Sequence, residues 1–347
     1  MTKQLDSLKF SYLHHTLVGS LKSCIDYLNI DVSEEWLYGM SSVAFLIATD
    51  KKVSTDAVAY GYDPGMIFRL VENVGIRVRG IHRAEDPVDR DGLLSSAWDY
   101  AKHAIDNNYP CFSFELEEGH EHAIIFGYDG KGYLSHGWHH RGTESIPWKK
   151  LGQQMCPCER CQEQRMNSEE QGNARFIDLH WVEPTPNKVS VLDAFQQMLS
   201  VLFQINDHRS WVYKGCAVGL AAYDNLIDTV DKGTVIGKNL GYNLDVYSEA
   251  RRRAPLFLNE VTMQIPAVPA ELSGQAIDAY QTVSDRLKHA SELYPWKQPF
   301  EPIGINEESQ KASRLLKEAK DAEATGLNAL REIYEKMQKV SLHETHL

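Results

Sequence analysis

The sequence predicts an α+β fold in which a mixed domain precedes an all-helical domain. Helical patterns dominate up to residue 110, and short strands then follow one another up to residue 184. Helices followed by a run of strands is the order expected of an α+β domain with an antiparallel sheet. From residue 190 onward, apolar residues recur every three or four positions, which is typical of amphipathic helices. Two prolines in the stretch 182–188 mark the switch, so we place the domains at 1–185 and 186–347.

The first predicted helix spans residues 12–29 and begins with three polar residues, His14, His15 and Thr16. Its apolar residues recur at the spacing of a buried helix face: Leu17, Leu21, Cys24, Ile25 and Leu28. A helix N-terminus concentrates unpaired N–H groups and positive potential, so a nucleophile is often found there, and so is a simple capping residue. Thr16 therefore has three interpretations: a capping residue, a ligand-binding hydroxyl or a nucleophile.

Further elements are expected before residue 95. Ser33, followed by acidic residues, starts a second helix, and the apolar run 41–50 predicts a buried strand. A helix opened by Pro64 and closed by Gly75 precedes an alternating strand over 76–82.

An amphipathic helix over 95–110 leads into the strands of the predicted sheet. The strands alternate apolar and polar residues and are separated by turn residues. They span residues 111–117, 121–129, 130–138 and 174–184. His122 lies in the second of these strands, where an isolated histidine is ordinarily structural.

Five amphipathic helices are expected in the second half, over 190–203, 216–230, 242–261, 275–294 and 306–340. This half shows no catalytic constellation. Arg251, Arg252 and Arg253 point to different faces of their helix, so some of them can pair with acidic residues of the same domain; for the group as a whole we expect a solvated basic face ahead of an anion-binding role. We expect the last helices to pack on the first domain or on a second copy of the chain, as a homo-oligomer.

Composition excludes some partners. A formal net charge of -12 argues against non-specific nucleic-acid binding, which requires a basic face. We find no apolar run that could span a bilayer and no secretory signal segment, so we expect a cytoplasmic protein without a membrane partner. The six cysteines fit this expectation as thiols or metal ligands.

Three cysteines lie close together in "MCPCERC": Cys156, Cys158 and Cys161. Thiolates at this spacing can ligate zinc from one loop, and a tetrahedral site then needs a fourth ligand. That ligand would come from "LSHGWHHRG", which contains His136, His139 and His140. Zinc is the one cofactor that the sequence suggests. The alternative is an exposed loop with free thiols or a redox pair.

Several stretches together form the pattern of one protein family. In the first half these are "SCIDYLNIDVSEEWLYG", "SSVAFLI", "AIDNNYPCFSFELE" and "HAIIFGYDGKGYL". In the second half they are "VGLAAYDNLI", "SEARRRAPLFLNEV" and "AEATGLNALREI". The first half resembles the N-terminal domain of the butirosin-biosynthesis protein H family, and the second resembles the helical domain of uncharacterised bacterial members. The resemblance implies a papain-like N-terminal domain with a central helix packed on an antiparallel sheet.

The resemblance also implies where a catalytic pair would lie. In that fold a cysteine at the N-terminus of the central helix is activated by a histidine on a strand, and these positions match Thr16 and His122. A threonine hydroxyl is far less acidic than a thiol and depends on a strong base. The orienting Asp or Asn of the family is replaced in the stretch of Ser135, His136 and Gly137.

We therefore expect a strongly diverged, non-catalytic member that binds a small peptide, amino-acid or acyl ligand in the ancestral cleft, with His14 and His15 as ligand-binding candidates. The alternative is an acyltransferase or amide hydrolase of a biosynthetic pathway. It would use Thr16 or an activated water, with His122 as base. In a third alternative the cysteine cluster holds zinc, as a structural ion or as the source of a metal-bound water.

Overall fold

The computed structural model describes residues 2–84, 89–117, 121–142, 144–152, 176–186 and 189–344. It confirms the α+β class, with helices and a sheet whose paired strands are all antiparallel. Within these residues no helix is both long and apolar enough to cross a membrane.

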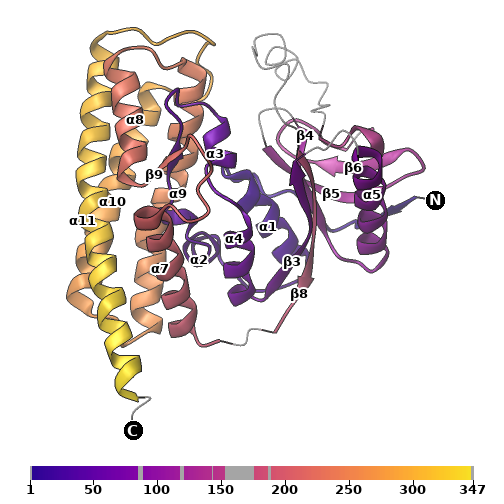
Figure 1. Ribbon diagram of the computed structural model, residues 1–347, viewed down its shortest axis with the longest axis horizontal. Coiled ribbons are helices and arrows are strands. Elements are labelled where there is room, and N and C mark those ends of the chain that lie inside the picture. The colour runs from indigo at the N-terminus through magenta and orange to yellow at the C-terminus, as the bar shows by residue number, and fades with distance from the viewer. Residues whose placement is uncertain are drawn as a thin grey trace. The chain divides into compact units, whose positions relative to one another are not determined.

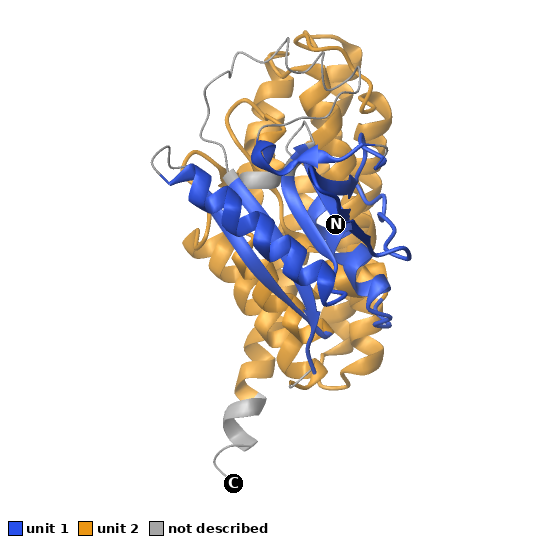
Figure 2. Cartoon of the chain, turned by 90° about the vertical axis from the view of Figure 1, so that its right-hand side faces the viewer, with its two compact units in different colours: residues 1–32, 75–186 blue, residues 33–74, 187–347 orange. Residues whose placement is uncertain are grey.

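The chain divides into two compact units, coloured separately in Figure 2. Unit 1 contains residues 1–32 and 75–186, and unit 2 contains residues 33–74 and 187–347. The two expected domains are each continuous in the sequence. In the structure the segment 33–74 packs with the later helices and belongs to unit 2. A short local sequence does not reveal such a long-range association.

Unit 1 is built on one antiparallel sheet with the strand order β3-β8-β4-β5-β6-β7, and β1 pairs with β5 (Figure 1). The strands are β1(Lys3–Gln4), β3(Ile76–Ala84), β4(Cys111–Glu117), β5(Glu121–Tyr128), β6(Gly132–His136), β7(Ile146–Pro147) and β8(Phe176–Pro184). The longest pairing joins β3 and β8, which lie far apart in the sequence. The order places β4 between β8 and β5, so residues of three strands share each face.

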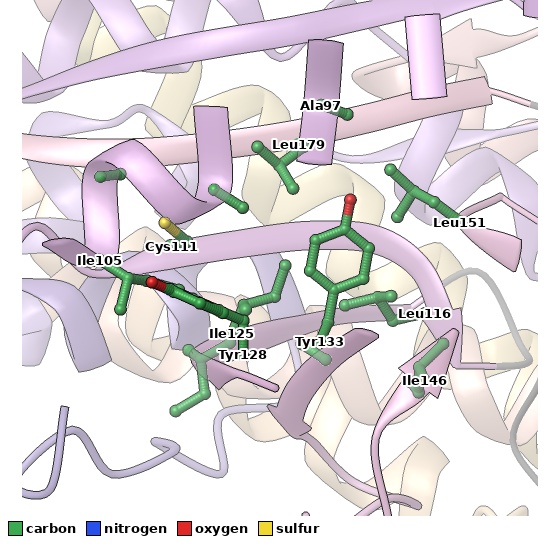
Figure 3. Packing of buried hydrophobic residues seen from close by; sticks show 14 of the residues in the cluster. Ala97, Ile105, Cys111, Leu116, Ile125, Tyr128, Tyr133, Ile146, Leu151 and Leu179 are labelled. Carbon is green, nitrogen blue, oxygen red and sulfur yellow. The ribbon is translucent and has the colours of Figure 1, made fainter. Parts of the chain in front are cut away.

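Two helices cover the two faces of this sheet, α1(Thr16–Tyr27) and α5(Arg90–Asp106) (Figure 1). The α5 face forms the main apolar core of unit 1, part of which is drawn in Figure 3. Ala97, Cys111, Ile125, Tyr133 and Leu179 pack there and are all fully buried. Strand residues alternate between faces, so Phe112, beside Cys111, and Asp178 and His180, on either side of Leu179, point toward the opposite face of the sheet.

Unit 2 is mainly helical. Its helices are α2(Glu34–Met40), α3(Asp56–Tyr60), α4(Gly65–Leu70), α7(Val191–His208), α8(Leu220–Asp231), α9(Gly237–Gln264), α10(Ala270–Leu293) and α11(Glu307–Glu344). A two-stranded sheet of β2(Ala48–Thr49) and β9(Ala217–Val218) adds to them, so the unit is not all-helical. The expected strand over 41–50 is a 3₁₀ turn, η1(Val43–Phe45), followed by the short β2. A buried apolar run does not distinguish these outcomes.

Arg251 is completely buried within unit 2, so it is one of the arginines that pair with an acidic residue and not part of the expected solvated basic face. Its guanidinium donates to both carboxylate oxygens of Glu323, at 2.8 and 3.1 Å. It also donates to three successive backbone carbonyls, those of Ala44, Phe45 and Leu46, at 2.9–3.1 Å. The fork of Arg251 thus fixes the turn around η1, whereas Arg252 is exposed as expected.

Candidate functional site

Thr16 and His122 lie next to each other, at the junction of α1 and β5. The backbone N–H of His122 donates to Oγ1 of Thr16 at 2.9 Å. Thr16 is the first residue of α1, and His15 occupies the N-cap position without a side-chain capping bond. Both side chains are buried, with 6% exposure for Thr16 and 7% for His122. The hydroxyl of Thr16 therefore joins the start of α1 to β5. This structural role differs from the cap, the ligand-binding hydroxyl and the nucleophile that the sequence suggested.

The imidazole of His122 is enclosed by aromatic rings. Its ring lies 4.8 Å from that of Phe114 and 6.1 Å from that of Phe112. Burial lowers the pKa of His122 to about 3, although the nearby Asp178 carboxylate acts in the opposite direction. At neutral pH the imidazole of His122 is therefore uncharged and is a weak base. It is poorly matched to removing a proton from a threonine hydroxyl.

The two histidines before Thr16 have different surroundings. His15 is buried, and its ring nitrogens make no hydrogen bond to another residue in the described part of the chain. Desolvation lowers the pKa of His15 to about 4. His14 is partly exposed, and its ring lies 5.7 Å from that of Trp138. Among the expected ligand-binding residues, only His14 therefore keeps access to solvent.

The histidines that were expected to complete a zinc site contact other groups. Nε2 of His136 is 2.8 Å from the hydroxyl of Tyr12, and Nε2 of His139 is 3.3 Å from Oε2 of Glu121. Nε2 of His140 is 3.0 Å from the backbone carbonyl of Glu144. Cys156, Cys158 and Cys161 lie outside the described residues. The proposed zinc ligation by the cysteines stays a prediction.

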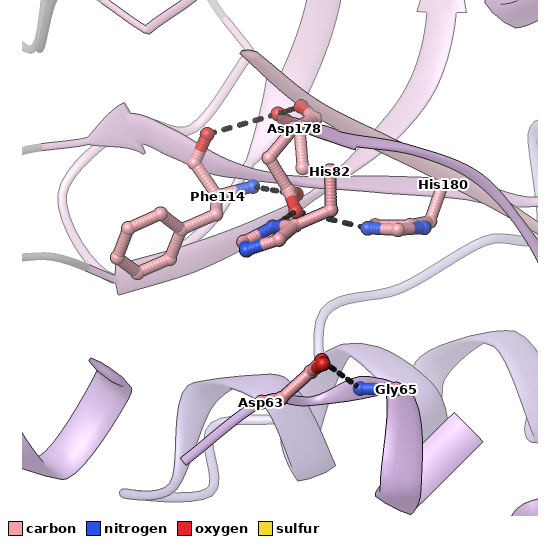
Figure 4. Close-up of polar contacts among 7 residues, drawn as sticks. Asp63, Gly65, His82, Phe114, Asp178 and His180 are labelled. Atoms are coloured by element: carbon pink, nitrogen blue, oxygen red, sulfur yellow. Dashed lines mark hydrogen bonds and ion pairs between the residues drawn. The ribbon is translucent and has the colours of Figure 1, made fainter. Parts of the chain in front are cut away.

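A second polar cluster was not predicted from the sequence, and Figure 4 shows it: His82 on β3 with Asp178 and His180 on β8. Oδ2 of Asp178 is 2.7 Å from Nδ1 of His82 and 2.9 Å from Nε2 of His180. The other carboxylate oxygen, Oδ1, accepts the backbone N–H of Phe114 at 2.8 Å. The turn at Asp63, drawn in the same figure, belongs to unit 2.

The sheet register explains why these side chains meet. His82 is the direct cross-strand partner of Asp178, and Asp178 and His180 are two residues apart on one strand, so all three share a face. Phe112 is the partner of His180 on the other side, and their rings stack at 5.2 Å. The alternation in "FIDLHWVEP" could have indicated that Asp178 and His180 share a face. The pairing with His82 could not have been found in the local sequence.

Burial and charge set the state of this cluster. Burial alone would favour the protonated acid of Asp178, but its hydrogen bonds to His180 and His82 lower the pKa of the carboxyl far below its usual range. The carboxylate is thus ionised and is held by three N–H groups. Ring nitrogens and a carboxylate oxygen of the three residues all lie within 4.8 Å of one another, the proximity that a shared metal ion requires.

A glycine leaves space for His180. Gly80 is the cross-strand partner of His180 and has a φ of +153°, where L side chains are strained. A Cβ at this position would lie 2.6 Å from Nδ1 of His180 and 2.1 Å from the carbonyl oxygen of Leu179. The imidazole of His180 therefore occupies space that any other residue at position 80 would fill.

The two polar groups of unit 1 belong to the same face of the sheet. His122 is the cross-strand partner of Phe114, and Phe114 binds Asp178 through its N–H. Phe114 on β4 thus separates His122 on β5 from Asp178 on β8. Strands lie about 4.8 Å apart, so His122 is roughly 10 Å from the Asp178 backbone. The carboxylate of Asp178 binds His82, His180 and the N–H of Phe114, and it is these groups that it orients.

A hollow on the surface of unit 1 lies elsewhere. It is lined by α5 and by the end of β5, through Trp98, Lys102, Asp106, Tyr128 and Asp129. None of the residues singled out in the sequence lines it.

A scan of the sequence against models of protein families gave no match, and a search of curated proteins gave none either.

Proposed function

We propose that the chain is a strongly diverged relative of the butirosin-H-like, papain-like proteins. In this proposal it no longer performs acyl transfer and binds a small peptide, amino-acid or acyl ligand through its N-terminal part. The observation that supports it is the hydrogen bond from the N–H of His122 to Thr16. The helix start and the strand histidine are adjacent, as the resemblance implies, but the hydroxyl serves as an acceptor in a structural contact.

The chemistry of the pair argues against the acyltransferase alternative. A threonine nucleophile needs a base that takes up its proton as the bond to the acyl carbon forms. Burial between Phe112 and Phe114 gives His122 a pKa of about 3, which removes most of the driving force for that transfer. Asp178 is held by His82 and His180 and does not assist it.

Acylation of the whole protein tests this proposal. The protein is incubated with p-nitrophenyl acetate and with aminoacyl thioesters of N-acetylcysteamine, and its intact mass and peptide map are recorded. We expect no acyl adduct on Thr16 and no difference in turnover between the native chain and Thr16→Ala. An adduct on Thr16 that disappears in Thr16→Ala, together with Thr16-dependent turnover, would establish the enzyme instead.

Ligand binding is measured in the same samples by isothermal titration with unreactive amide analogues of the thioesters and with dipeptides. We expect saturable binding of one of these classes, weakened in His14→Ala because His14 is the partly exposed histidine beside the helix start. Lys214→Ala, a change to an exposed residue of unit 2, is the control. The absence of saturable binding for every class would refute the ligand-binding part.

A further inference from the structure

We propose that His82, Asp178 and His180 form a binding site for a divalent first-row transition metal ion on the sheet of unit 1. This inference rests on the cluster between β3 and β8 and does not depend on the role of Thr16 or on the cysteine cluster. It goes beyond the proposed ligand-binding function, since it assigns a cation to residues that take no part in that function.

The donor set identifies the class of ion. Two imidazole nitrogens and one carboxylate oxygen suit zinc, iron, cobalt and nickel, whereas calcium and magnesium prefer all-oxygen sites. The donor atoms of the three residues lie within 4.8 Å of one another. Three protein ligands leave at least one position for water or a ligand oxygen, as in catalytic rather than structural zinc sites.

The distances are close to those of a loaded site. Ligand atoms around a tetrahedral zinc ion lie about 3.3 Å apart, given metal–ligand distances of about 2.0–2.1 Å. The two histidine nitrogens now lie 2.7 and 2.9 Å from Oδ2 of Asp178. An ion would therefore enter after these contacts lengthen by roughly 0.5 Å. In a loaded site each metal-bound imidazole would carry its proton on the opposite ring nitrogen.

The surroundings hold the ligands in place. The N–H of Phe114 fixes Oδ1 of Asp178 and leaves Oδ2 directed at both histidines. The ring of Phe112 stacks on His180, and the missing side chain of Gly80 leaves room for the same imidazole. Such outer contacts orient metal ligands and strengthen binding. The side chain of His82 keeps 20% exposure, whereas that of Asp178 keeps 2%, so solvent reaches the cluster on the His82 side.

Zinc titration of the full-length protein tests the site. The protein is purified without a histidine tag, stripped with a chelator and titrated with Zn²⁺ in competition with a fluorescent indicator. The titration is performed in the background Cys156→Ser, Cys158→Ser and Cys161→Ser, so that thiols do not contribute. We expect one equivalent to bind. Cobalt(II) should give the visible absorption of a site with mixed nitrogen and oxygen ligands.

His82→Gln is the decisive variant, because a glutamine amide can still donate to Asp178 but is a poor ligand for these ions. We expect zinc affinity to fall by more than the roughly 10–100-fold that outer-shell changes cost. The melting temperature without metal should stay close to that of the parent, whereas the rise that zinc causes in the parent should disappear. His103→Ala, a change to an exposed histidine of α5, should bind like the parent.

Two results would overturn the site. One is less than a tenth of an equivalent of bound zinc in the cysteine-free background. The other is unchanged affinity in a folded His82→Gln protein. If His82→Gln unfolds, His180→Asn replaces it, and retention of native affinity in that variant has the same meaning.

Discussion

The N–H of His122 and the hydroxyl of Thr16 are hydrogen-bonded at 2.9 Å, and this contact fixes the first turn of α1 to β5. The donor is a buried backbone group, and leaving it without an acceptor would cost free energy of folding. In unit 1 that acceptor is a side chain and not a neighbouring strand. Position 16 therefore requires a short side chain that ends in oxygen.

Replacing Thr16 by Val should weaken this junction, because the shape is kept but the acceptor is lost. We expect a loss of about 1–3 kcal/mol in the opening free energy of β5. Thr16→Ser should lose less than half of that amount. Hydrogen–deuterium exchange of peptides covering 121–128 measures the opening, and equal protection in Thr16→Val and the native chain would contradict the assignment.

Stability should fall as the pH falls from 7 to 5. His15 and His122 have folded-state pKa values of about 4 and about 3, against an ordinary value of about 6.5. The unfolded chain therefore binds more protons in this window, and stability present above pH 6.5 is lost as the pH falls. The loss is about 2 kcal/mol for each histidine by pH 5. The low pKa of Asp178 also stabilises the fold, but this contribution is fully present above about pH 4. It therefore stays constant between pH 7 and pH 5.

Urea unfolding at several pH values measures this slope. The slope of stability against pH reports how many more protons the unfolded state binds than the folded state. His122→Gln and His15→Gln should each lower this number by about one. His103→Gln, an exposed position, should leave the slope unchanged. A slope that His122→Gln and His15→Gln do not alter would show that other groups cause the pH dependence. His136 is one candidate, since burial also lowers its pKa.

Gly80→Ala should be strongly destabilising. The added Cβ would lie 2.1 Å from the carbonyl oxygen of Leu179, and the φ of +153° is itself unfavourable for alanine. We expect a loss of about 2 kcal/mol or more. Gly130→Ala in the same unit is the matched control, because nothing lies within 4 Å of its Cβ. Thermal unfolding compares the two, and similar melting temperatures would refute the steric argument.

Arg251→Met should destabilise unit 2 by about 3–5 kcal/mol, because it leaves the carboxylate of Glu323 buried without its partner. The double variant with Glu323→Leu should recover a large part of that loss, as an apolar pair replaces an ion pair. Arg252→Met, at an exposed position, should change stability by no more than about 0.5 kcal/mol. A urea double-mutant cycle measures the coupling, and additive single effects would contradict it.

Local patterns in the sequence predicted the elements better than their association. Alternation located β5 and thereby His122, and helical spacing located α1 and the buried Cys24. The strand expected over 41–50 is shortened to β2(Ala48–Thr49), and η1(Val43–Phe45) takes the middle of the run, because a fully buried segment has no alternation to distinguish a strand from a turn.

The candidate metal site could be predicted only in part. The spacing of Asp178 and His180 on one strand was visible, but their partner His82 comes from a strand nearly a hundred residues earlier. For a similar reason, the sequence did not identify Arg251 as an arginine that pairs with an acidic residue in the core. Its acceptors are the carbonyls of a distant turn, and no local pattern distinguishes it from the exposed Arg252.

The insertion of most of unit 1 between the two segments of unit 2 has a consequence for synthesis of the chain on the ribosome. The carbonyl of Leu46 is made 205 residues before the guanidinium of Arg251 that binds it. At about 5–20 residues per second, this acceptor waits roughly 10–40 s for its donor. Unit 1 is completed within that interval, while the apolar residues Val43–Phe45 still lack α9, whose Phe257 contacts Phe45. The nascent chain thus presents an apolar segment that chaperones can bind until α9 emerges.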